Sequence, residues 1–169
     1  GGIEVMGVVF VIVGFAFKVS AVPFHTWAPD TYEGAPTPVT AFLSVGSKAA
    51  GFVALVLLVY LAFPNADGVY RPFFWVMAAL TMTVGNVMAL RQTNIVRLLA
   101  YSSISHAGFL LLALASRSSA RFDLSSGGIV AFYLATYLPM TVLAFFVLCV
   151  ARRHGIGDSL EDLKGLGRR

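Results

Sequence analysis

Charged residues are scarce in this chain of 169 residues. Asp, Glu, Lys and Arg together make up 12% of it, whereas soluble globular domains carry about 25%. Hydrophobic residues make up 58%. A water-soluble bundle of buried helices is therefore disfavoured, because all-round apolar helices leave no polar face for water. The composition indicates a protein whose solvent is largely lipid.

Other common features are also rare or missing. The single cysteine, Cys149, excludes an internal disulfide and a cysteine-ligated metal site. No metal-ligand spacing, nucleophile–base pair or glycine-rich phosphate loop occurs, so no metal or bound cofactor is expected in this chain. The net charge of +4 comes from basic residues that flank apolar runs, which argues against a nucleic-acid partner. The chain begins at Gly1 without the features of a signal peptide, and we expect it to be a piece of a longer protein.

Long apolar runs dominate what is present. About 20 apolar residues are needed to span the ~30 Å hydrocarbon core as a helix, and five segments meet this length. We therefore predict an all-α fold, a polytopic transmembrane helix bundle occupying 1–151, with a connecting segment at 152–169 on the cytoplasmic side. The predicted helices are 1–33, broken near Pro23, then 38–63, 72–91, 93–116 and 127–151.

The distribution of Lys and Arg between loops predicts the orientation in the membrane. One side holds three basic residues and the other holds seven, and the richer side is expected to be cytoplasmic. We accordingly predict a multi-pass protein of the cell (inner or plasma) membrane. The poorer side has Arg71, Arg117 and Arg121, and the richer side has Arg91, Arg97, Arg152, Arg153, Lys164, Arg168 and Arg169.

Lys48 is the clearest ionisable residue inside a predicted span. It lies nine residues after Val39, which is about 14 Å along a helix that rises 1.5 Å per residue. A charge near the bilayer centre costs about 2.5–3.5 kcal/mol, so it requires a partner, a wet cavity or a function. Either Lys48 pairs with an acidic residue, or it carries protons. Ser44 and Gly51 are expected on the same helix face.

Lys18 lies near the end of the first predicted span, where an interfacial lysine could also reach the headgroups. The apolar run continues past it to Pro23 and His25, and proline cannot continue the hydrogen-bond ladder of a helix. We therefore predict an interruption between about Val19 and Phe24, with freed carbonyls beside Lys18 and His25. Interrupted helices at membrane depth occur where they line a cavity or are buried in protein, and they are common at transport sites.

The fourth predicted helix carries a polar stripe. His106 lies roughly 18 Å from Asn94 along the helix, and histidine can pass a proton near neutral pH. The alternative is a hydrogen-bonded packing residue. Tyr101 and Ser105 lie on one line of this helix, and Ser102 lies on the line of His106. Arg97 is expected to anchor the helix at the interface, and Asp30 and Glu33 to be solvated loop charges.

Three stretches of this chain resemble subunit N (chain 2) of respiratory complex I, one of its antiporter-like subunits. They are residues 17–39, which contain the predicted break, 41–50, which contain Lys48, and 85–106, which contain His106. The Phe-Lys-x-Ser form at Phe17 favours subunit N over its sister subunits L and M. One departure is Val96, where relatives often carry a basic residue.

This resemblance implies a proton-translocating membrane subunit without redox chemistry of its own. It implies the seventh to eleventh of about fourteen helices, the seventh being discontinuous. Lys18 and Lys48 would be channel lysines, and Lys18 would be gated by a glutamate on an earlier helix. NADH, FMN, iron–sulfur clusters and quinone would be bound by partner subunits, and the sister antiporter-like subunits would be neighbours in the bilayer.

The sequence leaves three alternatives open. The chain could belong to a ferredoxin-dependent photosynthetic relative of complex I, to a multi-subunit cation/proton antiporter, or to a membrane scaffold without transport. The residues 101–106 argue against the antiporter, and Lys48 argues against the scaffold. If Lys18, Lys48 and His106 share one hydrated path, we expect roughly one to three water molecules between their side-chain nitrogens.

Overall fold

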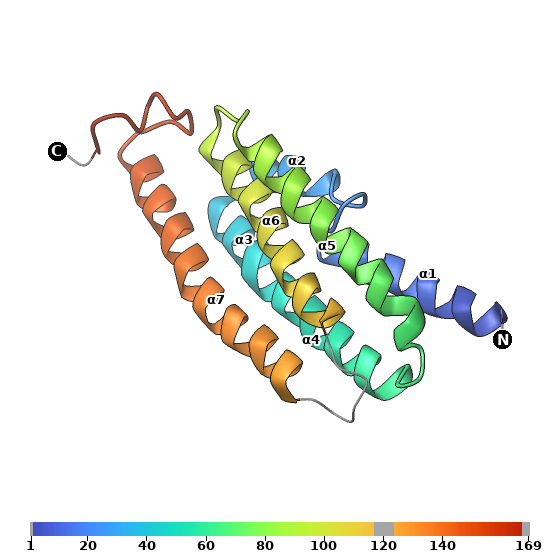
Figure 1. Ribbon diagram of the computed structural model, residues 1–169. Helices are drawn as coiled ribbons and strands as arrows, with labels where there is room; N and C mark the ends of the chain where they lie inside the picture. Colours follow the sequence, from blue (N-terminus) through green and yellow to red (C-terminus); the bar gives the residue numbers. More distant parts are fainter. Residues whose placement is uncertain (1, 117–123, 167–169) are drawn as a thin grey trace.

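A computed structural model describes residues 2–116 and 124–166 of the chain. The regular elements within these residues are helical (Figure 1). Two of them, η1 and η2, are π-helical turns. In chain order the elements are α1 (Gly2–Lys18), α2 (Trp27–Gly34), α3 (Thr37–Phe42), η1 (Leu43–Ser47), α4 (Lys48–Leu57), η2 (Leu58–Ala62), α5 (Asp67–Ala89), α6 (Ile95–Ala115) and α7 (Leu124–Arg153).

Four helices are long and apolar enough to cross a membrane. They are Thr37–Ala62, which joins α3, η1, α4 and η2, then Asp67–Ala89, Ile95–Ala115 and Gly127–Arg153. The shortest has 21 residues, or about 32 Å at 1.5 Å per residue. The first predicted span is not among them, because α1 has 17 residues and is only about 26 Å long.

Two helices begin earlier than the sequence predicts. α5 begins at Asp67 instead of residue 72 and includes Pro72. Asp67 lies in the first turn, where the helix dipole stabilises a carboxylate, and it accepts a hydrogen bond from the Gly68 N–H at 3.0 Å. α7 begins at Leu124 instead of residue 127, so Ser125 and Ser126 are also helical. Each helical glycine costs about 1 kcal/mol, and the stability of the long helix that follows offsets this cost.

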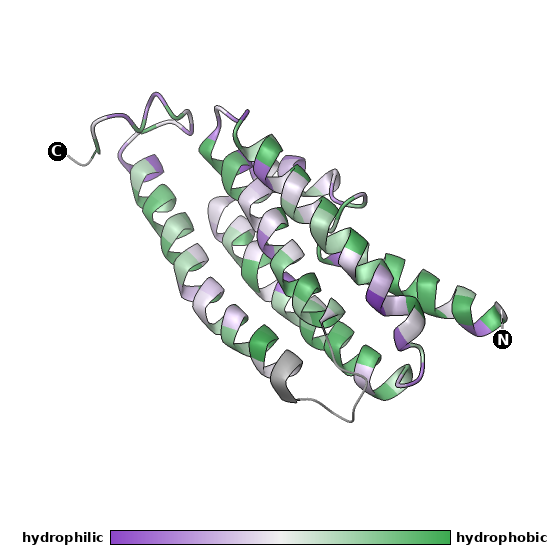
Figure 2. Ribbon diagram, in the orientation of Figure 1, coloured by the Kyte–Doolittle hydropathy of each residue, from purple (hydrophilic) through white to green (hydrophobic). Residues whose placement is uncertain are grey.

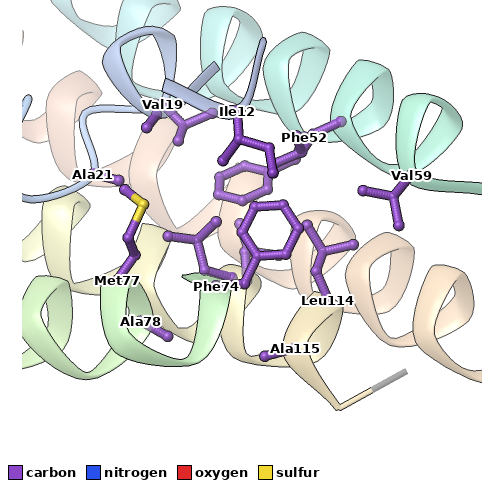
Figure 3. Packing of buried hydrophobic residues seen from close by; sticks show 14 of the residues in the cluster. Ile12, Val19, Ala21, Phe52, Val59, Phe74, Met77, Ala78, Leu114 and Ala115 are labelled. Carbon is purple, nitrogen blue, oxygen red and sulfur yellow. The ribbon is translucent and has the colours of Figure 1, made fainter. Parts of the chain in front are cut away.

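The core lies where α1, α4, α5 and α6 meet. Figure 3 shows Ile12, Phe52, Phe74 and Leu114, one from each of these helices, converging on one another. All four are at most 2% exposed. α6 is the central helix. In its most apolar stretch of 18 residues 67% are buried, against 28% in the corresponding stretches of α5 and α7.

Glycine allows α5 and α6 to approach closely. A Cβ placed on Gly85 of α5 would lie 2.7 Å from the backbone N of Ser105, and one on Gly108 of α6 would lie 2.9 Å from the backbone N of Met82. Each helix thus presents a glycine to the backbone of the other. Small residues at helix contacts are a principal means of association in membranes, where van der Waals packing replaces the hydrophobic effect.

The outer surface of the bundle is apolar. Figure 2 shows mostly hydrophobic residues along the helices and hydrophilic residues at the helix ends and along α6. Large side chains such as Phe132 and Phe146 of α7 are 74% and 63% exposed. A soluble protein rarely exposes so much contiguous apolar surface. The fold is therefore an all-helical transmembrane bundle.

The segment after α7 returns to the start of α6. The Ile95 N–H donates to the Asp158 carbonyl and the Leu160 N–H donates to the Thr93 carbonyl, both at 2.9 Å. α7 continues to Arg153, so the predicted connecting segment begins with two helical residues. Of the ten basic residues used to predict the orientation, Arg117, Arg121, Arg168 and Arg169 lie outside the described residues.

Candidate functional site

The chain leaves helical geometry directly after Lys18. α1 ends at that residue and α2 begins at Trp27. Ser20 has a φ of 60°, a value that few residues other than glycine adopt. The carbonyl of Phe17, which we expected to be free, accepts hydrogen bonds from the Ser20 N–H and from the Trp27 indole, both at 3.1 Å. At this position the expected free carbonyl is therefore paired.

Neighbouring helices hold the non-helical segment in place. The Val22 N–H donates to Thr81 Oγ1 of α5 at 3.0 Å in a buried position. On the other side the segment lies against α4, because a Cβ on Gly51 would lie 2.9 Å from Val19 Cγ1 and 3.4 Å from Lys18 Cγ. The aliphatic stem of Lys18 therefore contacts α4 three residues from Lys48.

Lys48 is the most deeply buried ionisable side chain of the predicted path. Its side chain is 3% exposed, and it is the first residue of α4, directly after the π-helical turn η1. Its Nζ donates to the Ser103 carbonyl oxygen of α6 at 2.5 Å and also to Ser103 Oγ. Ser103 is itself 2% exposed. π-helical turns are frequently found at functional sites.

His106 lies on the same helix as Ser103, three residues further along. It is half-buried, and its Nδ1 is 2.6 Å from the Tyr133 hydroxyl of α7. The ring of Tyr137 packs against the imidazole, with 4.9 Å between the ring centroids. A pocket of about 160 Å³ is lined by His106, Tyr133, Thr136, Tyr137 and Met140. Lys48 meets α6 at Ser103, about one helical turn before His106.

The other predicted site residues are placed differently. Ser44 is fully buried, but its hydroxyl donates to the Ala41 carbonyl at 2.8 Å within its own helix. Ser105 lies against Gly85 of α5, and Tyr101 packs in an apolar cluster with Tyr32 and Ile104. Of the sequence candidates, Lys48 and His106 are thus brought into the vicinity of each other.

The remaining candidates lie towards the surface. Pro23 is exposed, and Ser102 and His25 are half-buried. The His25 Nδ1 is buried and has no hydrogen-bond partner within residues 2–116 and 124–166. The side chain of Lys18 is exposed, so this chain does not enclose it.

Three charged residues, which we expected to act separately, form a cluster. Arg97 of α6 makes ion pairs of 2.7 Å with both Asp30 and Glu33, and the Asn94 side-chain amide donates to Glu33 at 3.1 Å. Asp30 and Glu33 lie in α2, not in a loop. The cluster fixes the end of α2 to the start of α6, a role that the sequence alone did not indicate.

The side chains that commonly bind metals are those of His, Cys, Asp and Glu. In the described ranges, no group of three or more such side chains could hold a metal ion.

The family model for the transmembrane region of NADH:quinone oxidoreductases and Mrp antiporters matches residues 2–168. The chain belongs to this family. It is 46% identical over 165 residues to "NADH-quinone oxidoreductase subunit N" of Trichlorobacter lovleyi, a match that covers 97% of this chain and 33% of that protein. It is 48% identical over 163 residues to "NAD(P)H-quinone oxidoreductase subunit 2" of Thermosynechococcus vestitus, covering 96% and 30%. The chain thus spans about a third of the length of these curated relatives.

Two solved complexes contain a similar fold. One is respiratory complex I from Thermus thermophilus with bound aureothin, with a TM-score of 0.73 and 39% identity over 88% of this chain and 31% of that chain. The other is the membrane-bound sulfane sulfur reductase, an archaeal respiratory membrane complex, with a TM-score of 0.77 and 30% identity over 88% and 30%. The predicted resemblance to subunit N is confirmed by these comparisons.

The structure adds site residues of this family member that the sequence did not single out. Ser103 was overlooked as the partner of Lys48, and Tyr133 and Tyr137 were overlooked as neighbours of His106. One signal was available for Ser103, because residues three apart lie on the same face of a helix and Ser103 precedes His106 by three. No local signal existed for the two tyrosines, because they lie on another helix.

Proposed function

We propose that the chain is the central part of the membrane subunit N of a complex I, an NADH:quinone oxidoreductase, and that it translocates protons without redox chemistry of its own. Relatives named for NADH-quinone oxidoreductase subunit N support this. Electron transfer from NADH to quinone, with FMN and iron–sulfur clusters, belongs in this proposal to partner subunits. The sister antiporter-like subunits are neighbours in the inner or plasma membrane.

The proposal includes a fifth, discontinuous span. α1 and α2 together with the segment between them form a transmembrane element with a break after Lys18. The hydrogen bond from Val22 to Thr81 and the contact of Val19 with Gly51 support a break that is built into the bundle. Non-helical backbone is tolerated at membrane depth where protein surrounds it.

Lys48 is the observation that carries the proposal. A lysine near the bilayer centre costs about 2.5–3.5 kcal/mol, and each hydrogen bond to a charged group returns about 1.5–3 kcal/mol. Its two bonds to Ser103 therefore offset the cost of burial. Lys48 makes no ion pair with an acidic side chain in the part of the chain that the structure describes. Without a fixed counter-ion, the ammonium group is not locked in its protonated form.

The roles follow from this arrangement. Lys48 binds and releases the proton, Lys18 delivers it from the side of the break, and His106 accepts it towards α7. His25, Ser44, Tyr101, Ser102 and Ser105 remain supporting candidates, and Pro23 maintains the break.

Replacing Lys48 in the intact, membrane-embedded complex tests the proposal. In Lys48→Ala, quinone-coupled proton translocation in proteoliposomes should fall at least about tenfold, as expected on losing a positioned proton carrier, while the subunit still assembles. Lys48→Arg should also impair it, because arginine remains protonated. Undiminished translocation by the assembled Lys48→Ala complex would refute the proposal.

The electron donor defines a second candidate. A relative named NAD(P)H-quinone oxidoreductase subunit 2 from Thermosynechococcus vestitus is as similar as those named subunit N, so similarity to subunit N does not set the electron donor, and the ferredoxin-dependent photosynthetic relative stays the second candidate. The family also includes Mrp antiporters. Purification of the native complex separates these candidates: NADH-binding subunits with iron–sulfur clusters indicate complex I, their absence with a ferredoxin-binding module indicates the photosynthetic relative, and antiporter subunits alone indicate the antiporter.

A further inference from the structure

The bond between Lys48 and Ser103 requires a further hydrogen-bond partner. A serine hydroxyl has one O–H donor and two acceptor lone pairs. Since Ser103 Oγ accepts from Lys48 Nζ, its own proton is available for a second group. The hydroxyls of Tyr32 and Tyr137 both lie beside Ser103, and both tyrosines are at least 95% buried, with 2% and 5% of their side chains exposed.

Tyr137 differs from the other buried hydroxyl groups of this site. It lies near Ser103 and Thr141, yet no group within the described ranges meets hydrogen-bond geometry with its hydroxyl oxygen. A buried hydroxyl without a partner costs about 1–3 kcal/mol. Such groups are normally satisfied by an internal water. The hydroxyl therefore marks a position where a water molecule completes the network.

The ring of Tyr137 lies between the buried Lys48–Ser103 pair and a pocket at the surface of α6 and α7. The ring packs on His106, and both residues line the pocket of about 160 Å³. A single water needs about 10–15 Å³ of such space, so the pocket is large enough for water. His106, the Tyr133 hydroxyl and the Thr136 hydroxyl provide polar groups on its wall, so the waters would have partners.

We propose that Tyr137 of α7 is a further proton-path residue, which connects the buried Lys48–Ser103 pair to a hydrated pocket at His106. This rests on the proposed function and adds a residue and a water site to it. The direction is from the centre of the bundle towards α7, whereas the sequence suggested a path along α6 through Tyr101, Ser102 and Ser105.

The transfer is balanced without electrons or a co-reactant. Lys48 Nζ gives a proton to Ser103 Oγ as the hydroxyl proton of Ser103 passes through a bridging water to the Tyr137 oxygen. Tyr137 gives its former hydroxyl proton to a water, which passes one of its protons to the unprotonated ring nitrogen of His106. Lys48 ends neutral and His106 ends positively charged. Both hydroxyls and both waters end unchanged.

Removal of a single oxygen tests the proposal in the assembled complex. Tyr137→Phe keeps the ring that packs on His106 and removes only the hydroxyl. Tyr70→Phe is the matched control, because Tyr70 is a fully buried tyrosine that lies in the apolar core with Phe74. Proton translocation and electron transfer are measured together in proteoliposomes, in H₂O and in D₂O, with the amount of assembled subunit as the reference.

We expect Tyr137→Phe to slow proton translocation at least about tenfold and to raise the ratio of its rates in H₂O and D₂O, because proton transfer becomes limiting. A purely structural role would not change that ratio. Wild-type translocation by Tyr137→Phe overturns the inference. If Lys48→Ala is impaired in the same assay, the proposed function stands and only the role of Tyr137 is refuted. If Lys48→Ala is also active, the proposed function itself fails.

A second variant tests the water. Thr136 is exposed at the wall of the pocket, so Thr136→Leu can fill part of it without disturbing the core. We expect slower translocation in Thr136→Leu and near wild-type translocation in Thr136→Ser, which keeps the hydroxyl. Equal rates in the two variants would show that the pocket does not carry water for this path.

Discussion

The ammonium group of Lys48 is enclosed by this chain, whereas the side chain of Lys18 is exposed at the end of α1. Lys48 reaches from α4 to Ser103 of α6 and both residues are at most 3% exposed. Around Lys18 the backbone is fixed, through Val22 and Thr81, but the charged end is left open. Two lysines of one predicted path thus have different surroundings. The bundle encloses the charged end of Lys48 and leaves that of Lys18 open.

Chemical accessibility gives the largest expected contrast. In the full-length complex, cysteine is placed at one site at a time as Lys18→Cys or Lys48→Cys, with Cys149→Ser as the background. A water-soluble maleimide should label the first variant at least about tenfold faster, because an enclosed site reacts only through local opening. Mass spectrometry of the labelled subunit measures the rates. Equal labelling rates would contradict the difference in enclosure between Lys18 and Lys48.

Close packing at the break should make Gly51 intolerant of a side chain. Gly51→Ala places a methyl group 2.9 Å from Val19 Cγ1, and such overpacking costs about 1–3 kcal/mol. We expect a lower thermal midpoint for the purified complex and a loss of translocation. Gly14→Ala, where nothing lies within 4 Å of the new Cβ, is the control and should have no such effect.

The hydroxyl of Thr81 should stabilise the break by satisfying the Val22 N–H. Thr81→Val keeps the shape and removes the acceptor, which leaves a buried donor unpaired at a cost of about 1–3 kcal/mol. Hydrogen exchange at the Val22 amide should therefore speed up, and Thr81→Ser should restore its protection. Thr83→Val is a further control, because Thr83 is exposed and its hydroxyl donates to Ala79 within its own helix. Unchanged exchange in Thr81→Val would remove this support for the break.

The charged cluster at the end of α2 should contribute least. Asp30 and Glu33 are 74% and 42% exposed, and exposed ion pairs contribute about 0–1 kcal/mol. Arg97→Gln should lower stability by no more than that, and the difference from wild type should shrink at high salt. A thermal midpoint measured at low and high salt checks this. A large loss of stability that does not depend on salt would show that the cluster has a role other than ion pairing.

The sequence was sufficient to predict the class of fold and the position of the main charge. Scarce charges and long apolar runs decide whether a helix enters a bilayer, and these are properties of each segment alone. Lys48 and His106 were found for the same reason, because an ionisable residue far from a helix end is costly wherever the helix packs. The comparisons confirm the family that the motifs around Lys48 and His106 indicated.

Partners and exact starts of helices could not be predicted in this way. Which residue of α6 meets Lys48 depends on the rotation of both helices, and the π-helical turn before Lys48 changes that rotation. The tyrosines of α7 reach His106 only through tertiary packing. α5 was predicted to begin too late because the residues at 64–68 favour both a turn and a helix start, and only the carboxylate of Asp67 in the first turn decides between them.

The reciprocal glycines of α5 and α6 have a mechanical consequence. Gly85 and Gly108 each admit the backbone of the opposite helix. The contacts between the two helices should therefore break together and not one side chain after another. If the protein were pulled out of a bilayer from one end in a force microscope, α5 and α6 should leave the membrane in a single rupture event. α7, which is largely exposed along its length, should come out separately and at lower force.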